Sequence, residues 1–196
     1  MELRDAMRRR RMVRNYLDEP VPREAVERLV DLARRAPSAG FSQGQYFVVV
    51  TEQELRSRIA ELAEEEHYVS LGFPPWISKA PVHVVVCTRE DDYHNRYREP
   101  DKVEDDGSEI EWPVPYWYVD AGASLMLLLL GAVDEGLGAG FFGVHRLPGL
   151  QELLGLPRDV TPVGIVTLGF AAPDQPQGSA RRGRKPLAHA VRWERW

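Results

Sequence analysis

Two arginine-rich runs, one near each end of the chain, are the residues best suited to chemistry with an anion. The first is Arg8–Arg11 followed by Arg14, and the second is Arg181–Lys185. Guanidinium groups bind phosphate oxygens through paired hydrogen bonds. Either run could be a solvated surface, but two runs so distant in sequence could also converge on one small anion such as a phosphate.

The charge balance disfavours a nucleic-acid partner. The 196-residue chain has a net charge of −5, yet residues 90–111 hold ten acids and three strong bases, so that segment is −7 and the remainder +2. Domains that bind nucleic acid are usually basic overall. We therefore expect a small-molecule partner, with no nucleic acid and no membrane.

Motifs for several other chemistries are missing from the sequence. Cys87, the one cysteine, excludes an internal disulfide or a cysteine-built zinc site, and we expect it to be a small buried strand residue. Ser38 and Ser42 lack the GxSxG context of a hydrolase nucleophile. No His, Asp or Glu cluster has metal-ligand spacing, and neither a GxGxxG turn nor a P-loop occurs. We predict no catalytic side chain and no metal, and the lone cysteine and polar N-terminus indicate the cytoplasm.

A long apolar helix is expected to organise the fold. Between Asp120 and Asp134 no residue is charged, and Ala, Leu and Met dominate the stretch. A helix that is apolar on every side needs burial on every side, so we predict a central core helix over Asp120–Gly136. The run is shorter than the roughly 18–20 residues of a membrane span.

The remaining elements are expected to surround this helix in a single domain over residues 1–196. Hydrophobic periodicity and turn signals predict helices at about 3–11, 22–33, 53–62 and 149–154. Short apolar runs predict buried strands at 46–50, 82–86 and 162–169, with a further short strand after Gly138.

Two segments are expected to extend from the core. Residues 89–118 are acidic and aromatic, and the two prolines of Trp112–Tyr118 argue against regular helix or central strand there. Because long loops are usually functional or mobile, we favour a lid or a subunit contact over a disordered insertion. Residues 171–196 form a C-terminal extension whose Trp193 and Trp196 should dock on a surface.

Four motifs together resemble the FMN-dependent nitroreductase family. In chain order they are Arg10–Arg14 after a first helix, Ala36–Gly40 before a first strand, Gly136–Gly138 after the long apolar helix, and Arg182–Leu187. Each motif alone is weak, but their order matches the family over nearly the whole chain. The resemblance implies an α+β fold, with a mixed sheet flanked by helices around the central helix, in an intertwined homodimer with an FMN site at each subunit interface.

The resemblance also assigns residues to the flavin phosphate and its pyrimidine edge. Arg10, Arg11, Arg182 and Arg184 would hold the phosphate and ribityl chain. Arg14 would face the pyrimidine edge, where a cation stabilises the negative charge that develops on reduction.

Two further segments would line the flavin ring, the first of them from the partner subunit. Their residues are Pro37, Ser38, Ala39, Phe41 and Gln43 in the first segment, and Phe141, Phe142 and Gly143 in the second. Core packing explains the two phenylalanines equally well.

Three positions depart from the family pattern. Met12 replaces a usual serine beside the phosphate or ribityl chain, Phe41 stands where asparagine is common, and Gly44–Gln45 replaces a frequent Pro-Trp pair. These changes concern the shape and polarity of the substrate side more than flavin binding.

The implied activity is transfer of hydride from NADPH or NADH, through FMN, to a nitroaromatic, quinone or similar acceptor. No dinucleotide fingerprint is present to choose between the two reductants. The alternatives are a flavin-consuming or dehalogenating member of the same fold, and a non-catalytic protein that binds flavin or nucleic acid.

Overall fold

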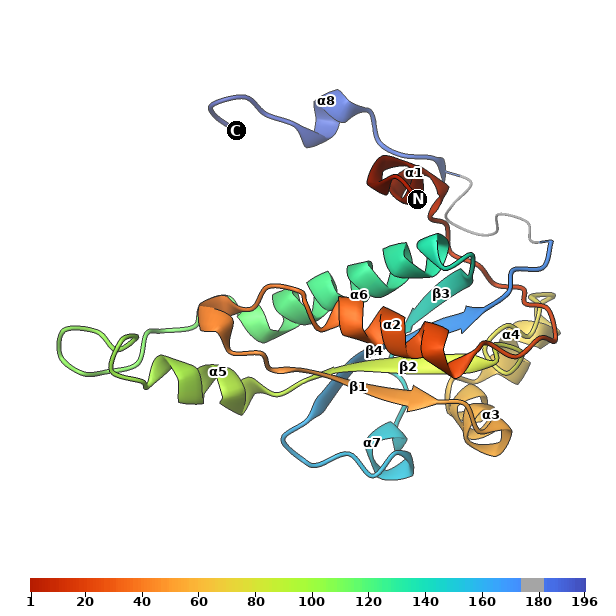
Figure 1. Ribbon diagram of the computed structural model, residues 1–196, viewed down its shortest axis with the longest axis horizontal. Helices are drawn as coiled ribbons and strands as arrows, with labels where there is room; N and C mark the ends of the chain where they lie inside the picture. The colour runs from red at the N-terminus through yellow and green to blue at the C-terminus, as the bar shows by residue number, and fades with distance from the viewer. Residues whose placement is uncertain (174–181) are drawn as a thin grey trace.

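The computed structural model describes residues 1–173 and 182–196, and its centre is a four-stranded sheet (Figure 1). The strands are β1 (Gln45–Val50), β2 (Val82–Thr88), β3 (Gly138–Gly143) and β4 (Thr161–Gly169), in the order β1-β2-β4-β3. The α+β class is confirmed. The family resemblance implies a mixed sheet, whereas the described strands of one chain pair only in antiparallel fashion.

The position of each strand in the sheet decides how deeply it is buried. All seven residues of the inner strand β2 are buried. They include Cys87, whose pKa burial raises to about 11, so the thiol stays protonated and serves as the small core residue that was predicted. The prediction that β1 is a buried strand is wrong, because β1 is an edge strand on which Tyr46 and Val49 are exposed.

Helices cover both faces of the sheet. Helices α2 (Arg23–Ala33) and α6 (Tyr116–Asp134) pack with Val84 of β2, and α3 (Gln53–Leu62) and α7 (Leu150–Leu153) pack with Val85 on the opposite face. Neighbouring strand residues point to opposite faces, which places these two valines in different core clusters. The remaining helices are α1 (Leu3–Arg9), the 3-10 helix η1 (Ala39–Phe41), α4 (Glu65–Ser70), α5 (Glu90–Tyr97) and α8 (Leu187–Ala190).

The central helix α6 is longer and less buried than its sequence predicts. It begins at Tyr116, directly after Pro115 at the N-cap, so the end of the proline-containing stretch is helical. Val119 and Met126 are 53% and 44% exposed, so burial on every side is wrong for a single chain. By length and apolar composition α6 could cross a membrane, a property shared by core helices of soluble proteins.

Residues 10–17 form an extended segment, called the arm below, that runs along β3 and the end of β4. The backbone N–H of Val13 donates to the carbonyl of Ala139, and that of Leu17 donates to Phe170, both at 2.9 Å. The arm therefore joins the start of the chain to the end of its last strand. Figure 1 shows α1 and α8 on the same side of the molecule, above α6. Arg181, and most of the linker expected after Ala171, lie outside the described residues.

Candidate functional site

The arm lies unusually close to the backbone of β3. A Cβ atom at Gly140 would lie 2.6 Å from the carbonyl oxygen of Val13 and 2.8 Å from Cζ3 of Trp76. Only glycine permits such an approach. The hydroxyl of Tyr16 bonds the Thr167 hydroxyl at 2.7 Å, which fixes the end of the arm to β4. The arm is thus held rigidly where its arginines could receive a ligand.

The arginines of the arm differ in their surroundings. Arg10 follows α1 directly, is half-buried, and has a buried Nη1 without a hydrogen-bond partner among the described residues. Arg11 is exposed, whereas Met12 is half-buried against the core cluster of α2 and α6. The guanidinium carbon of Arg14 lies 5.5 Å from the ring centroid of Trp76, a cation–π arrangement.

The C-terminal run approaches the same end of the molecule. The side-chain amide of Asn15 donates to the carbonyl of Pro173 at 2.8 Å, so residue 173 lies beside the arm. From there to Arg182 an extended chain could span up to about 30 Å. Arg182 and Arg184 are exposed. Their convergence with Arg10 on one phosphate stays a prediction.

The loop over residues 37–43 is clamped by two helices. The N–H of Ala39 donates to the buried Asp120 of α6 at 2.9 Å, and Arg96 of α5 donates to the carbonyl of Gly40 at 2.9 Å. Within the loop, the N–H of Gln43 donates to the hydroxyl of Ser38 at 2.9 Å. These contacts fix the loop from three directions.

The same loop presents an aromatic ring to solvent from a left-handed backbone. Phe41 and Gln43 have φ angles of 60° and 55°. Phe41 is also 73% exposed to solvent. A left-handed residue other than glycine costs about 1 kcal/mol or more, and such strain persists only where surrounding contacts impose it. The clamp on Ala39 and Gly40 supplies those contacts.

Within one chain the clamped loop and the arm lie at opposite ends of α6 (Figure 1). Asp120 holds the loop near the start of α6, while Asp134 at its end accepts from the N-terminal amino group at 2.7 Å. At about 1.5 Å per residue the two carboxylate positions are separated by about 21 Å along the helix. The structure therefore does not bring these two groups of predicted residues together in a single chain.

The side chains of Phe141 and Phe142 point to opposite faces of β3. Phe141 packs against the cluster that contains α6, and Phe142 packs against the opposite cluster. Core packing thus accounts for both rings, and at most one of them could line a flavin on one face of the sheet. Gly143 ends the strand and is half-buried.

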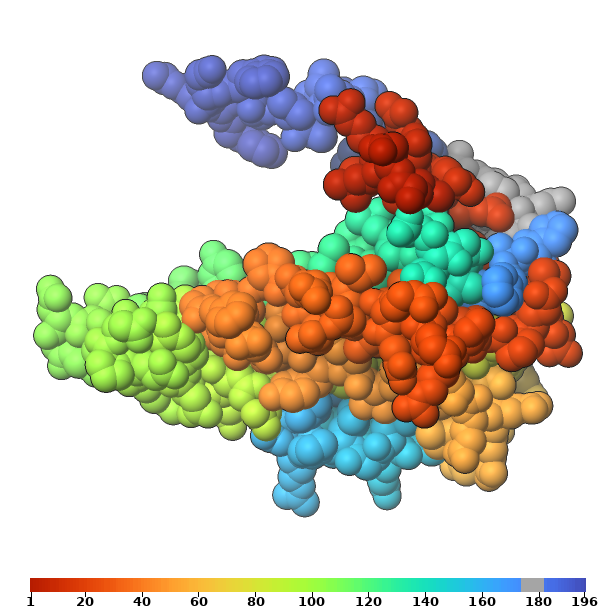
Figure 2. Space-filling model, in the orientation of Figure 1, coloured from red at the N-terminus to blue at the C-terminus, as the bar shows by residue number. Residues whose placement is uncertain are grey.

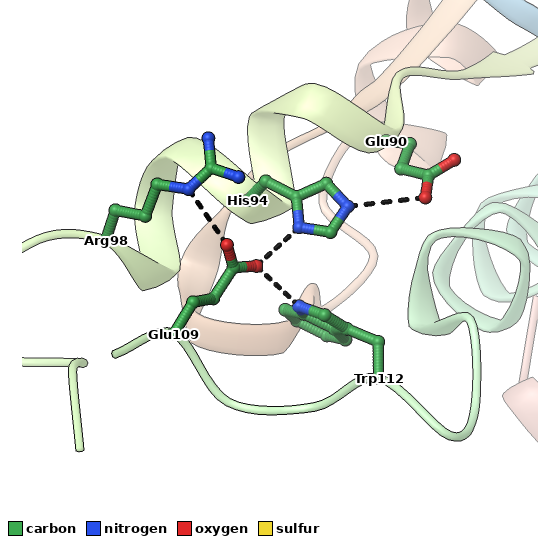
Figure 3. Close-up of polar contacts among 5 residues, drawn as sticks. All are labelled: Glu90, His94, Arg98, Glu109 and Trp112. Atoms are coloured by element: carbon green, nitrogen blue, oxygen red, sulfur yellow. Dashed lines mark hydrogen bonds and ion pairs between the residues drawn. The ribbon is translucent and has the colours of Figure 1, made fainter. Parts of the chain in front are cut away.

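The acidic insertion contains helix α5 and a loop tethered to it (Figure 3). Glu109 of the loop accepts hydrogen bonds from Trp112 Nε1 at 2.7 Å and from Arg98 Nε at 2.9 Å. It also contacts Nδ1 of His94, whose Nε2 lies 3.3 Å from Glu90. The insertion therefore has its own polar anchor and is not a single irregular loop.

This anchor should respond to pH through His94. The hydrogen bond to Glu109 raises the pKa of His94 above its ordinary 6.5, opposed by partial burial and supported by Glu90. Because the folded-state pKa is raised, the tether contributes fully below about pH 6.5 and weakens as the pH rises through the raised value. We expect amide protection in residues 104–114 to fall over that range, measured by hydrogen exchange corrected for intrinsic rates. His94→Gln should abolish this pH dependence, and an equal dependence in both proteins would contradict the assignment.

Comparison with known proteins identifies the family. Residues 7–170 match the Nitroreductase family. The chain belongs to the nitroreductase family. The FMN reductase (NAD(P)H) of Bacillus subtilis is 31% identical over 181 residues, which cover 90% of this chain and 67% of that protein.

Two further proteins are similar to this nitroreductase-family chain over most of its length. An iodotyrosine deiodinase of Haliscomenobacter hydrossis is 25% identical over 189 residues, covering 85% of this chain and 78% of that protein. The solved structure of a hypothetical oxidoreductase from Bacillus subtilis has a TM-score of 0.77 and 26% identity, covering 100% of this chain and 75% of that one.

The described residues of this nitroreductase-family chain fit the phosphate that the resemblance implies. A buried donor without an acceptor is rare in proteins and unfavourable. Nη1 of Arg10 is such a donor within the part of the chain that the structure describes, and Arg10 begins the arm whose close packing depends on Gly140. An anion at this point would supply the missing acceptor and form a charge-assisted hydrogen bond.

Sequence reasoning missed one residue at this site. Trp76 contacts both Arg14 and Phe142, yet it follows Pro74 and Pro75, where no periodicity predicts the direction of a side chain. The signal in the sequence that could have indicated Trp76 was its position directly after two prolines and close to a strand.

Proposed function

We propose that this protein is an FMN-dependent oxidoreductase that takes hydride from NADPH or NADH and reduces a nitroaromatic, a quinone or a similar small molecule. The observation that carries the proposal is the buried Nη1 of Arg10, which has no hydrogen-bond partner among residues 1–173 and 182–196, at the motif through which the chain resembles flavin-binding relatives. Bound FMN supplies the redox chemistry itself, accepting hydride from the nicotinamide and passing two electrons to the acceptor.

The chain's own residues bind and orient the flavin. Arg10, Arg11, Arg182 and Arg184 hold the phosphate and ribityl chain. Arg14 keeps a positive charge at the pyrimidine edge, where it favours the reduced form. The backbone of residues 141–143 passes along the ring. No side chain has to act as nucleophile or as an obligatory acid.

The site is completed by a second copy of the chain. Asp120, which holds the clamped loop, and Asp134, which bonds the N-terminal amino group, are about 21 Å apart along α6. The clamped loop and the arm lie at opposite ends of this helix (Figure 1), so Pro37, Ser38, Ala39, Phe41 and Gln43 reach the flavin from the partner subunit. The apolar face of α6, with Val119 and Met126, supplies the surface that the partner buries.

The C-terminal tail is the second contact of this homodimer. Figure 2 shows the tail standing away from the body with open space between them. Trp193 and Trp196 are 84% and 100% exposed, so the docking expected of them does not occur within the described part of one chain. We assign their docking surface to the partner.

The insertion at residues 89–118 shapes the acceptor side. Arg96 holds Gly40, and the ring of Tyr97 packs where a Cβ of Gly40 would stand, with Cε2 at 2.6 Å. The insertion thus sets the position of Phe41, the exposed ring that departs from the family pattern. We place the enzyme in the cytoplasm, as a domain of residues 1–196 with a C-terminal extension from 171.

Absorbance of the purified protein tests this proposal. We expect a peak at about 450 nm, about one FMN per chain, and bleaching by NADPH or NADH in the absence of oxygen. A colourless protein that binds no added FMN would refute the proposal.

A dehalogenating activity is the second candidate, because a relative named as an iodotyrosine deiodinase aligns over 85% of the chain. Release of iodide from iodotyrosine by the reduced protein, together with slow reduction of nitroaromatics, would favour it.

A further inference from the structure

Trp76 lies in the turn between α4 and β2, outside every motif that carries the family resemblance. It is half-buried and belongs to two apolar clusters, one with Phe142 and one with Val13 and Tyr16. It therefore bridges the arm and β3, the two segments of one chain that the proposed function places at the flavin.

Polar side chains on three elements fix the turn that carries Trp76. The buried carboxylate of Glu65 accepts from the N–H groups of Ile77 at 2.5 Å and Ser78 at 3.1 Å. His83 of β2 donates from Nε2 to the carbonyl of Ile77 at 2.8 Å, and Arg56 of α3 donates to the carbonyl of Ala80 at 2.7 Å. Anchors on α3, α4 and β2 hold the residues directly after Trp76.

The protonation state of His83 supports a permanent anchor. Burial lowers its pKa to about 4, so the ring is neutral near pH 7 and its Nε2 hydrogen faces the carbonyl of Ile77. The turn is therefore expected to stay in place throughout the neutral pH range.

The indole of Trp76 makes two directed contacts. Its ring centroid lies 5.5 Å from the guanidinium carbon of Arg14. It meets Phe142 edge-to-face, with centroids 5.5 Å apart and an interplanar angle of 87°. The missing side chain of Gly140 leaves room for its Cζ3 atom. The indole thus rests on β3 while it contacts the arginine.

We propose that Trp76 is a positioning residue of the flavin site, which holds the guanidinium of Arg14 at the flavin's pyrimidine edge. This inference rests on the proposed function. A cation over an indole gains about 0.5–2 kcal/mol, depending on desolvation. An arginine confined in this way keeps its charge where reduction places negative charge.

The midpoint potential of bound FMN tests the inference. We expect Trp76→Leu to shift the potential to lower values and to slow hydride uptake from NADPH roughly two- to thirty-fold, the factor that corresponds to the loss of the cation–π contact. Trp76→Phe retains an aromatic face and should restore part of the potential. Phe73→Leu is the matched control, because Phe73 lies in the same segment but packs on Tyr68, with centroids 6.3 Å apart.

The outcomes separate this inference from the proposed function. A yellow Trp76→Leu protein with the wild-type potential would overturn the role of Trp76 alone. Equal shifts in Trp76→Leu and Phe73→Leu, together with equal losses of thermal stability, would also overturn it by indicating a general packing effect. If Trp76→Leu does not fold, the potential of Trp76→Phe decides, since an unchanged value contradicts the inference. Wild-type protein that binds no FMN would refute both proposals.

Discussion

Replacing Arg10 with alanine is expected to weaken FMN binding roughly ten- to a hundredfold, because a charge-assisted hydrogen bond contributes about 1.5–3 kcal/mol. The free energy of unfolding of the flavin-free protein should change little, since Nη1 of Arg10 has no hydrogen-bond partner among the described residues. A loss of FMN affinity without a loss of folding stability indicates a residue whose role is to bind the ligand. Titration of the flavin-free protein with FMN, followed by flavin fluorescence, measures the affinity, and urea unfolding measures the stability.

Arg8 provides the matched control for this substitution. It lies on α1 two residues earlier, and its side chain is 79% exposed. Arg8→Ala removes the same charge but should leave FMN affinity within about twofold, because exposed charges are screened by salt. Arg182→Ala, at the far end of the chain, should weaken binding as Arg10→Ala does. Equal effects of Arg8→Ala and Arg10→Ala would show that only the overall charge matters.

Replacing Met126 with lysine is expected to convert the proposed dimer to monomers and to remove the flavin at the same time. Met126 is exposed on α6 in one chain and would be buried by the partner. An unpaired buried lysine costs about 3 kcal/mol or more, so the dissociation constant of the dimer should rise at least about a hundredfold. Sedimentation velocity measures the assembly, and absorbance at about 450 nm measures the flavin that remains.

Leu71→Lys is the control for the loss of the dimer. Leu71 follows α4 and is 61% exposed, so the lysine enters a comparable apolar position away from α6. This variant should remain dimeric and yellow. A Met126→Lys protein that is monomeric yet retains FMN would show that one chain is sufficient for binding.

The parts of the fold that could be predicted from the sequence are those with a strong local pattern. The valine-rich run of β2, interrupted by His83, marks a buried strand, and the uncharged stretch of α6 marks a helix against the sheet. Both patterns depend on burial within one chain. The edge position of β1 depends on pairing between distant segments, so the same kind of apolar run misled the prediction there.

The exposure of α6 could not be predicted, because it depends on a surface that the single chain leaves uncovered. An apolar helix has the same sequence pattern whether its outer face packs against its own chain or against another copy. Helix α5 was hidden for a different reason, since its charged sequence has no apolar stripe. Its first turn, with Glu90, Asp91 and Asp92, nevertheless carried the acidic signal of a helix start.

The candidate site was predictable only where it follows a contiguous motif. The arm and the clamped loop correspond to short motifs around Arg10 and Ser38. Trp76 and Asp120 act through contacts between segments far apart in sequence, with Asp120 bonded to Ala39 at 2.9 Å. Contacts of this kind produce no regular residue spacing that could be recognised in the sequence.

The most direct test of a flavin site built from two copies is to purify a mixed dimer of two defective chains. One chain carries Arg10→Ala, and the other carries Phe41→Glu, which places a carboxylate on the exposed ring position of the clamped loop. In the proposed dimer each site takes Arg10 from one chain and Phe41 from the other, so the mixed dimer would have one intact site and one doubly defective site. We predict that about half of its sites bind FMN with wild-type affinity, as two-fold symmetry requires. A mixed dimer with no wild-type site would contradict the shared site and place the whole flavin contact within a single chain.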